Sequence, residues 1–223
     1  MKSAEAPKKT DKLVLYNIGV NLGTYDPATN KAGDFLFTKM IDDHYSNKAF
    51  LEFGAELTGP SGTDIMPHPT YFLPRGTKVF SPVAGRVENV RFQAESNDYE
   101  IVVVPEGFSS WRVSLDHVIN VLPQKGDSVK AGEIVAEVAP SKSSAVPPDF
   151  GWVELQVWQE YSSFWNREML ATCPFLLLDQ SVKQDVALKI SKLAEDWEDF
   201  LEKDVYSQEK WVSPGCLLET AKP

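Results

Sequence analysis

Few side chains in this sequence can bind a metal ion or move protons near neutral pH. The chain has three histidines, His44, His68 and His117. Because imidazoles and carboxylates both ligate zinc or manganese, His68 and His117 are candidates for a metal site. Each also has a purely structural interpretation. His68 would be a loop residue packed between Pro67 and Pro69, and His117 a turn residue that is hydrogen-bonded after its strand.

The two cysteines, Cys173 and Cys216, offer a different chemistry. Each lies beside a turn-forming residue, Pro174 or Gly215, and a predicted helix separates them. A disulfide here would close a loop of about 40 residues and stabilise the fold by roughly 3–4 kcal/mol. We therefore predict a disulfide and an oxidising compartment, against the alternative of two buried thiols in a cytosolic protein.

The elements that would position these side chains are mainly strands. Two segments, 76–87 and 125–138, alternate apolar residues between glycines, with turns predicted at Ser81-Pro82 and Ala84-Gly85. Short strands joined by tight glycine turns are typical of a compact β-barrel or sandwich. Further strands are predicted at 99–104, 111–115 and 152–158. One face of the last strand carries Trp152, Glu154, Gln156 and Trp158.

The pattern divides the chain into four parts. Residues 1–12 are expected to be a disordered leader, and 13–69 an N-terminal β extension with a loop. Residues 70–160 are the β core, and 161–223 a C-terminal extension. In this last part apolar residues recur at helical spacing from about Ser181 to Lys203. We predict an amphipathic helix there that packs on the β core, with Trp197 as a core residue.

Composition excludes some classes of function. The net charge of −10 argues against nucleic acid and anionic membranes, because both require clustered lysine and arginine. No apolar run approaches the roughly 20 residues that would span a bilayer, so no transmembrane segment is expected. The first ten residues lack the apolar stretch of a signal peptide, and we interpret them as a leader left after a signal was removed.

Four segments, in order and spacing, resemble the LytM-like M23 peptidases, zinc enzymes that cleave peptide cross-links in bacterial cell walls. Residues 76–87 resemble the family's Gly-Thr-x-Val-x-(Ala/Ser)-Pro-x-x-Gly-x-Val segment, and 115–118 its aromatic-x-His step. Residues 121–134 resemble its Val-and-Gly repeat, and 152–157 align with its His-Leu-His-Phe-Glu-Val strand. The resemblance covers under half of the chain. It implies a mainly β, duplicated-hybrid-motif barrel or sandwich, here with the N-terminal β extension and the C-terminal helix.

The zinc ligands that the resemblance implies are missing from their positions. The family binds zinc through a His-x-x-x-Asp pair and the second His of a His-x-His strand, and here Trp152 and Glu154 occupy the two His positions. An ungapped alignment places the family's His-x-x-x-Asp pair at Met66 and Thr70, and an alignment with a gap places it at Pro60 and Asp64. His117 is retained where the family has a residue that stabilises the transition state. We therefore expect no cofactor and no zinc-dependent catalysis.

The resemblance thus predicts a non-catalytic, secreted or envelope-associated bacterial protein. It would bind cell-wall glycopeptide, carbohydrate or a partner protein in a cleft formed by Trp152, Glu154, His117 and Trp158. The alternative is an active metallopeptidase or other hydrolase whose rearranged zinc site uses Asp64, His68 and Glu154, with His117 as the catalytic candidate. These side chains would then have to converge. A third possibility is an interaction domain whose cleft is closed by Trp152 under the loop 141–150.

Overall fold

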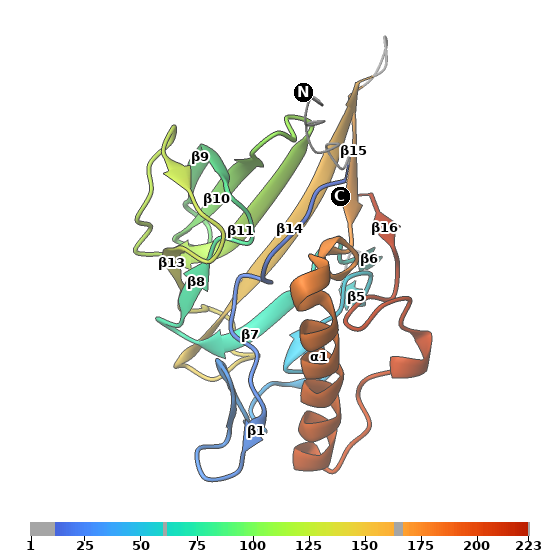
Figure 1. Ribbon diagram of the computed structural model, residues 1–223. Helices are drawn as coiled ribbons and strands as arrows, with labels where there is room; N and C mark the ends of the chain where they lie inside the picture. The colour runs from blue at the N-terminus through green and yellow to red at the C-terminus, as the bar shows by residue number, and fades with distance from the viewer. Residues whose placement is uncertain (1–11, 60–61, 163–166, 223) are drawn as a thin grey trace.

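The computed structural model describes residues 12–59, 62–162 and 167–222. Strands dominate this part of the chain, and one α-helix, α1 (Gln180–Leu201), stands beside them (Figure 1). The mainly β prediction is therefore confirmed, as is the C-terminal helix within two residues at each end. Most of the predicted leader, residues 1–11, lies outside the described residues.

One sheet of eleven strands forms the body of the molecule. Its main path runs through seven strands in the order β12 (Ser128–Val129), β9 (Gly85–Gln93), β10 (Asp98–Pro105), β11 (Trp111–Ile119), β14 (Phe150–Ser162), β15 (Arg167–Thr172) and β16 (Thr220–Ala221). Four more strands branch from it, namely β13 (Ile134–Val138), β8 (Lys78–Phe80), β7 (Thr70–Pro74) and β4 (Phe50–Leu51). The sheet does not close on itself, so the fold is an open form of the predicted barrel or sandwich.

The smaller elements belong mostly to the N-terminal extension. A three-stranded sheet contains β1 (Tyr25–Asp26), β2 (Lys31–Ala32) and β3 (Phe35–Leu36), and a hairpin pairs β5 (Glu56–Gly59) with β6 (Gly62–Ile65). The short 3-10 helices are η1 (Asp43–Tyr45), η2 (Pro174–Leu177) and η3 (Gln208–Lys210). Because β4 pairs with β7, the extension contributes one strand to the main sheet.

The glycines of the two similar segments serve two different purposes. Gly76, Gly126 and Gly132 have φ angles of 78°, 96° and 80°, which favour glycine in tight turns. Gly85, however, is the first residue of β9, so the predicted turn at Ala84-Gly85 is wrong. A Cβ atom there would lie 2.3 Å from the carbonyl oxygen of Val104. Gly85 is therefore required by close packing of two strands, which strand periodicity does not reveal.

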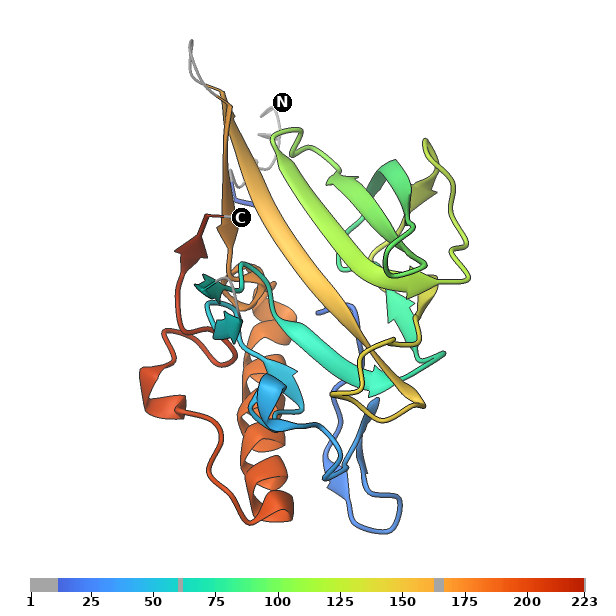
Figure 2. The same ribbon diagram turned by 180° about the vertical axis from the view of Figure 1, so that it is seen from behind.

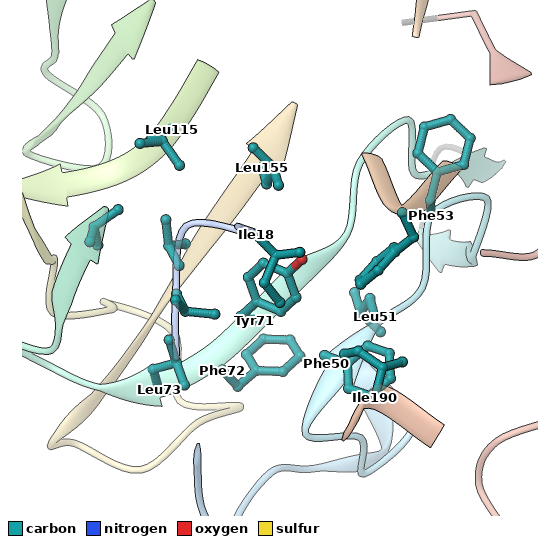
Figure 3. Packing of buried hydrophobic residues seen from close by; sticks show 14 of the residues in the cluster. Ile18, Phe50, Leu51, Phe53, Tyr71, Phe72, Leu73, Leu115, Leu155 and Ile190 are labelled. Carbon is teal, nitrogen blue, oxygen red and sulfur yellow. The ribbon is translucent and has the colours of Figure 1, made fainter. Parts of the chain in front are cut away.

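Strand β14 crosses the whole molecule and organises the core (Figure 2). Val153, Leu155 and Val157 are each at most 1 % exposed, whereas the alternate residues are half-buried. Leu155 pairs with Leu115 of β11 and lies on the core side with Tyr71 of β7 (Figure 3). Burying these branched side chains is the main source of stability at this strand, since each contributes about 1.5–3 kcal/mol.

The helix α1 is anchored to the N-terminal extension. Asp179 caps its first turn by accepting a hydrogen bond from the Ser181 N–H. Trp197 is a core residue, as predicted. Its ring lies 5.0 Å from that of Phe37, and its indole N–H donates to the Asn47 carbonyl at 2.8 Å. The apolar face of α1 thus packs against residues of the N-terminal extension, whereas the sequence analysis predicted that it would pack on the β core.

The predicted disulfide is present between Cys173 and Cys216, which are 43 residues apart and fully buried. Cys216 also forms a parallel bridge with Phe53, so the disulfide ties the C-terminal segment to both η2 and the N-terminal extension. Across the described ranges, no helix has the length and apolar character that a membrane span requires.

Candidate functional site

Polar side chains line one face of four neighbouring strands, and we call this surface the polar face. Its position follows from the register, because Glu154 of β14 pairs with Asp116 of β11, and Gln156 with Ser114. Paired residues share a face of the sheet, so the polar residues of adjacent strands gather on the same side. The polar face consists of Asn89, Arg91, Gln93, Asp98, Glu100, Arg112, Ser114, Asp116, Trp152, Glu154, Gln156 and Trp158.

His117 lies where β11 changes partners. Asp116 still pairs with β14, whereas Val118 pairs with Val138 of β13. At the change His117 has a φ of 59°, a left-handed conformation in which histidine is several-fold enriched among non-glycine residues. Its carbonyl accepts a hydrogen bond from Ala139, and its N–H donates to the Asp116 carboxylate at 2.7 Å. The backbone therefore fixes the His117 ring against the polar face.

The His117 imidazole lies among three carboxylates. Its Nδ1 is 2.8 Å from Asp98 Oδ2, and its Nε2 is 3.8 Å from Glu154 Oε1. Because a carboxylate accepts hydrogen bonds, Nδ1 carries the proton of the neutral ring and leaves the lone pair on Nε2. Burial alone would lower the pKa of His117, but the charges of Glu154, Asp116 and Asp98 outweigh burial and raise it.

His68 lies against the opposite side of Glu154. Two residues after His68, Thr70 begins β7 and pairs with Glu154 of β14. The Pro69 carbonyl between them accepts a hydrogen bond from the Leu155 N–H. His68 Nε2 is 3.3 Å from Glu154 Oε2, and Nδ1 is 3.4 Å from the Thr70 hydroxyl. Burial and the neighbouring His117 lower the pKa of His68 to about 4, so the ring is neutral at neutral pH.

Glu154 is the centre of this arrangement, because its two oxygens face two different imidazoles. The Gln156 side chain donates a third contact, at 3.2 Å from Oε2. Burial raises the pKa of Glu154 to about 7, and the Asp116 charge adds to this, while His117 and the Gln156 hydrogen bond act in the opposite direction. A buried carboxylate with this environment needs either a proton or a cation near neutral pH.

Two acidic residues of the site were not among the sequence candidates. Asp98 holds His117 and accepts a 2.5 Å hydrogen bond from Ser96. Asp116 accepts from the Gln93 amide and the His117 N–H, and burial raises its pKa. Ligand atoms of Asp98, Asp116 and His117 all lie within 4.8 Å of one another. The sequence signal that could have identified these two residues is their position, because each is an acidic residue directly beside an end of a predicted strand, 99–104 or 111–115.

Trp152 lines a cavity of about 270 Å³ under the loop that follows β13. Its ring contacts those of His117, Tyr45 and Phe72, at centroid distances of 5.4, 5.9 and 6.4 Å. The cavity is also lined by Asp98, His117 and the loop residues 139–143. Trp152 therefore packs against three neighbouring rings and presents part of its surface to the cavity that the loop also lines.

The other candidates lie elsewhere. Trp158 lines a separate, wider groove of about 500 Å³ with Arg112 and Glu100, farther along the polar face. Asp64 is exposed on the β5–β6 hairpin, where it pairs with Leu57. Within the described segments, no hydrogen bond or ion pair joins Asp64 to His68, His117 or Glu154. The structure thus brings His68, Glu154 and His117 together and leaves Asp64 apart.

Comparison with protein-family models found no match, and comparison with curated proteins found none either. Among solved structures, the chain is similar to the antimicrobial peptidase lysostaphin from Staphylococcus simulans, with 20 % identity and a TM-score of 0.46 over 59 % of this chain and 49 % of that one. It thus spans about half of that protein's length.

Two further solved structures are similar. One is a catalytic-domain mutant of the prophage-encoded M23 protein EnpA from Enterococcus faecalis, with 23 % identity, a TM-score of 0.39, and coverage of 49 % of this chain and 81 % of that one. The other is Csd3 from Helicobacter pylori, with 16 % identity, a TM-score of 0.40, and coverage of 89 % of this chain and 45 % of that one.

Proposed function

We propose that this protein is a secreted or envelope protein that binds cell-wall glycopeptide along its polar face, without the zinc-dependent cleavage of the M23 peptidases that its sequence resembles. The observation that carries the proposal is Trp152. It occupies the position of a family histidine, and its indole lines the cavity at one end of the polar face. Indole faces are suited to stacking against sugar rings and apolar parts of peptides.

The chemistry of the face agrees with such a ligand. Glycopeptides present hydroxyl, amide and charged groups, and the polar face offers carboxylates, amides and Arg112 between two tryptophans. Most small-ligand sites combine apolar walls with a few placed polar groups in this way. The buried Cys173–Cys216 disulfide supports an oxidising location, where such a ligand is found.

The residues at the family's zinc positions do not fit zinc. Met66 and Thr70 stand at the ungapped positions of the His-x-x-x-Asp pair and offer only a thioether and a hydroxyl, which are poor zinc donors, so Glu154 is the one usual zinc ligand at the three positions. We therefore derive no catalytic step through zinc bound in the family's manner. A second candidate function is hydrolysis by a rearranged site. One observation favours it, namely the 3.3 Å separation of His68 Nε2 and Glu154 Oε2.

Binding to purified, protein-free cell-wall sacculi tests the proposal. We expect the intact protein to co-sediment with sacculi, and Trp152→Ala to lose at least about 2 kcal/mol of binding free energy, as a central aromatic contact does. The matched control is Phe92→Ala, which removes a 51 % exposed aromatic ring from the opposite face of the same sheet.

Three outcomes would contradict the proposal. If the wild-type protein stays in the supernatant, or if both variants bind equally, the polar face is not a glycopeptide site. If chromatography of the incubated sacculi shows newly cleaved peptide cross-links, the protein is an enzyme and the second candidate replaces the first.

A further inference from the structure

We propose that the Trp152 cavity binds a primary ammonium group on an aliphatic chain, such as a free amine of a cell-wall peptide. That the ammonium belongs to such a peptide rests on the proposed function. The preference for an alkylammonium ion follows from the cavity itself, which is lined by a buried carboxylate, an imidazole and an indole.

The volume of the cavity favours one branch of a ligand over a whole sugar unit. The cavity holds about 270 Å³, whereas sites for complete small ligands usually measure about 300–1,000 Å³. Ala139, Pro140 and Trp152 line it with apolar surface, and Asp98 and His117 add polar atoms. A chain of methylene groups that ends in a small polar group matches both the volume and this combination of surfaces.

Asp98 supplies the charge that selects a cation. Its side chain is 4 % exposed, and its two oxygens accept hydrogen bonds from Ser96 at 2.5 Å and from His117 Nδ1 at 2.8 Å. A carboxylate has about four acceptor positions, so capacity remains for a donor from the ligand. Because water screens a buried charge weakly, Asp98 attracts an ammonium group more strongly than an exposed carboxylate would.

The negative charge behind this wall has no lysine or arginine partner. Asp98, Asp116 and Glu154 surround His117, while across the described ranges the ion pairs of lysine and arginine involve other carboxylates. His68, which contacts Glu154, is neutral at neutral pH. Even when His117 and Glu154 are both protonated, the two aspartates leave one negative charge in excess. Electrostatic complementarity therefore favours a cationic ligand over a neutral or anionic one.

Trp152 provides the aromatic surface that an ammonium group also prefers. Cations bind over indole faces better than over other aromatic rings, because the face of the ring carries negative electrostatic potential. The Trp152 ring contacts those of Tyr45 and Phe72 at centroid distances of 5.9 and 6.4 Å, so it is oriented before a ligand enters. Methylene groups next to the ammonium would then be buried against Ala139 and Pro140.

Lys142 is the one lysine or arginine among the described residues that line the cavity. Its Nζ donates to the Glu95 carbonyl at 3.1 Å, which joins the loop after β13 to the turn between β9 and β10. Lys142 is exposed, and its charge opposes a second ammonium group in the cavity. Its removal should therefore strengthen the binding of a cation, which a pocket without charge preference would not show.

Two matched probes, titrated into isotope-labelled protein and followed by NMR, test the charge preference. Nα-acetyl-lysine amide carries an ammonium group, and its Nε-acetylated derivative has the same chain without the charge. For a ligand of this size we expect a dissociation constant on the order of 1 mM for the cationic probe, and binding at least about tenfold weaker for the neutral one. The indole N–H signal of Trp152, identified by its loss in Trp152→Phe, should shift.

Asp98→Asn keeps the shape of the wall and removes its charge. We expect it to bind the cationic probe at least about tenfold more weakly, as the loss of a charged hydrogen-bond partner does, and to leave the neutral probe unchanged. Lys142→Met should bind the cationic probe roughly twofold to fivefold more tightly, since exposed charges interact weakly. The control Asp185→Asn makes the same change in net charge on α1 and should bind like the wild type. Melting curves establish that each variant is folded.

Three results would overturn the ammonium site. These are a cationic probe that binds no better than the neutral one, shifts that exclude the Trp152 indole, or binding by Asp98→Asn that is no weaker than by Asp185→Asn. Sacculi whose free amines have been acetylated are compared with untreated sacculi by co-sedimentation. If both bind equally, the ammonium site fails and the proposed function is retained. If neither binds although the cationic probe does, the site is retained and the glycopeptide function fails.

Discussion

The two faces of β14 differ sharply, although they alternate along one strand. One face, Val153, Leu155 and Val157, is buried in the core and contributes stability. The other, Trp152, Glu154, Gln156 and Trp158, is half-buried and carries charge, hydrogen bonds and aromatic surface. The comparison shows how a strand at the centre of a core can also form a site, because each residue belongs to one face only.

The largest loss of stability is expected from a substitution on the apolar face of β14. Leu155→Ala should lower the free energy of unfolding by about 2–5 kcal/mol, because it leaves a cavity beside Leu115 and Tyr71. Urea denaturation with the disulfide intact measures the change. A loss below 1 kcal/mol would mean that the core relaxes around the strand and that the faces are less distinct than their burial indicates.

A smaller effect is expected where the strand begins. A Cβ atom at Gly151 would lie 1.7 Å from the Ala139 carbonyl oxygen, so Gly151→Ala must displace backbone. Overpacking of this kind costs about 1–3 kcal/mol. Because Ala139 leads into the loop over Trp152, we also expect a changed tryptophan fluorescence spectrum. An unchanged spectrum with full stability would show that the loop moves freely.

The two ends of the polar face should contribute unequally to binding. Trp158 lines the wider groove, away from the enclosed cavity at Trp152. Trp158→Ala should therefore weaken binding to sacculi by about tenfold or less, equivalent to at most about 1.4 kcal/mol. The co-sedimentation isotherm is the measurement. A larger loss than that of Trp152→Ala would move the centre of the ligand site to the groove.

The smallest effect is expected at Gln156. Its amide donates one 3.2 Å hydrogen bond to Glu154, and water can replace it, so Gln156→Ala should cost about 0.5 kcal/mol of stability. Thermal melting of Gln156→Ala and Leu155→Ala in parallel compares the loss of stability at these two neighbouring residues. A loss as large as that of Leu155→Ala would show that the polar face is also essential to the core.

Periodicity along the sequence predicted much of this fold. The alternation in 152–158 indicated a strand with two different faces, and the helical spacing after residue 180 indicated α1. The turn chemistry of Pro174 and Gly215 indicated the disulfide between their neighbours. The strand and the helix depend on residues close in sequence, which is why pattern alone was sufficient for them. The disulfide joins residues 43 apart and was predictable because the chain has only two cysteines.

Features that depend on residues far apart were not predictable in the same way. Gly85 was assigned to a turn, because its approach to Val104 depends on the pairing of β9 with β10. His68 and Glu154 were candidates for one rearranged site, but whether they meet depends on the pairing of β7 with β14. Asp98 was missed, since only the β10–β11 register places it beside His117.

The segment that contains Leu15 has a consequence for how the molecule assembles. Leu15 exchanges backbone hydrogen bonds with Leu177 and Asp179, just before α1, while Tyr16 and Gly19 bond to the loop and strand around Pro82 and Phe80. During synthesis from the N-terminus, Tyr16 and Gly19 can pair once residues 80–82 have emerged, but Leu15 has no backbone partner until the chain has emerged beyond residue 179. Folding should therefore finish late and slowly, as expected for structures with many distant contacts.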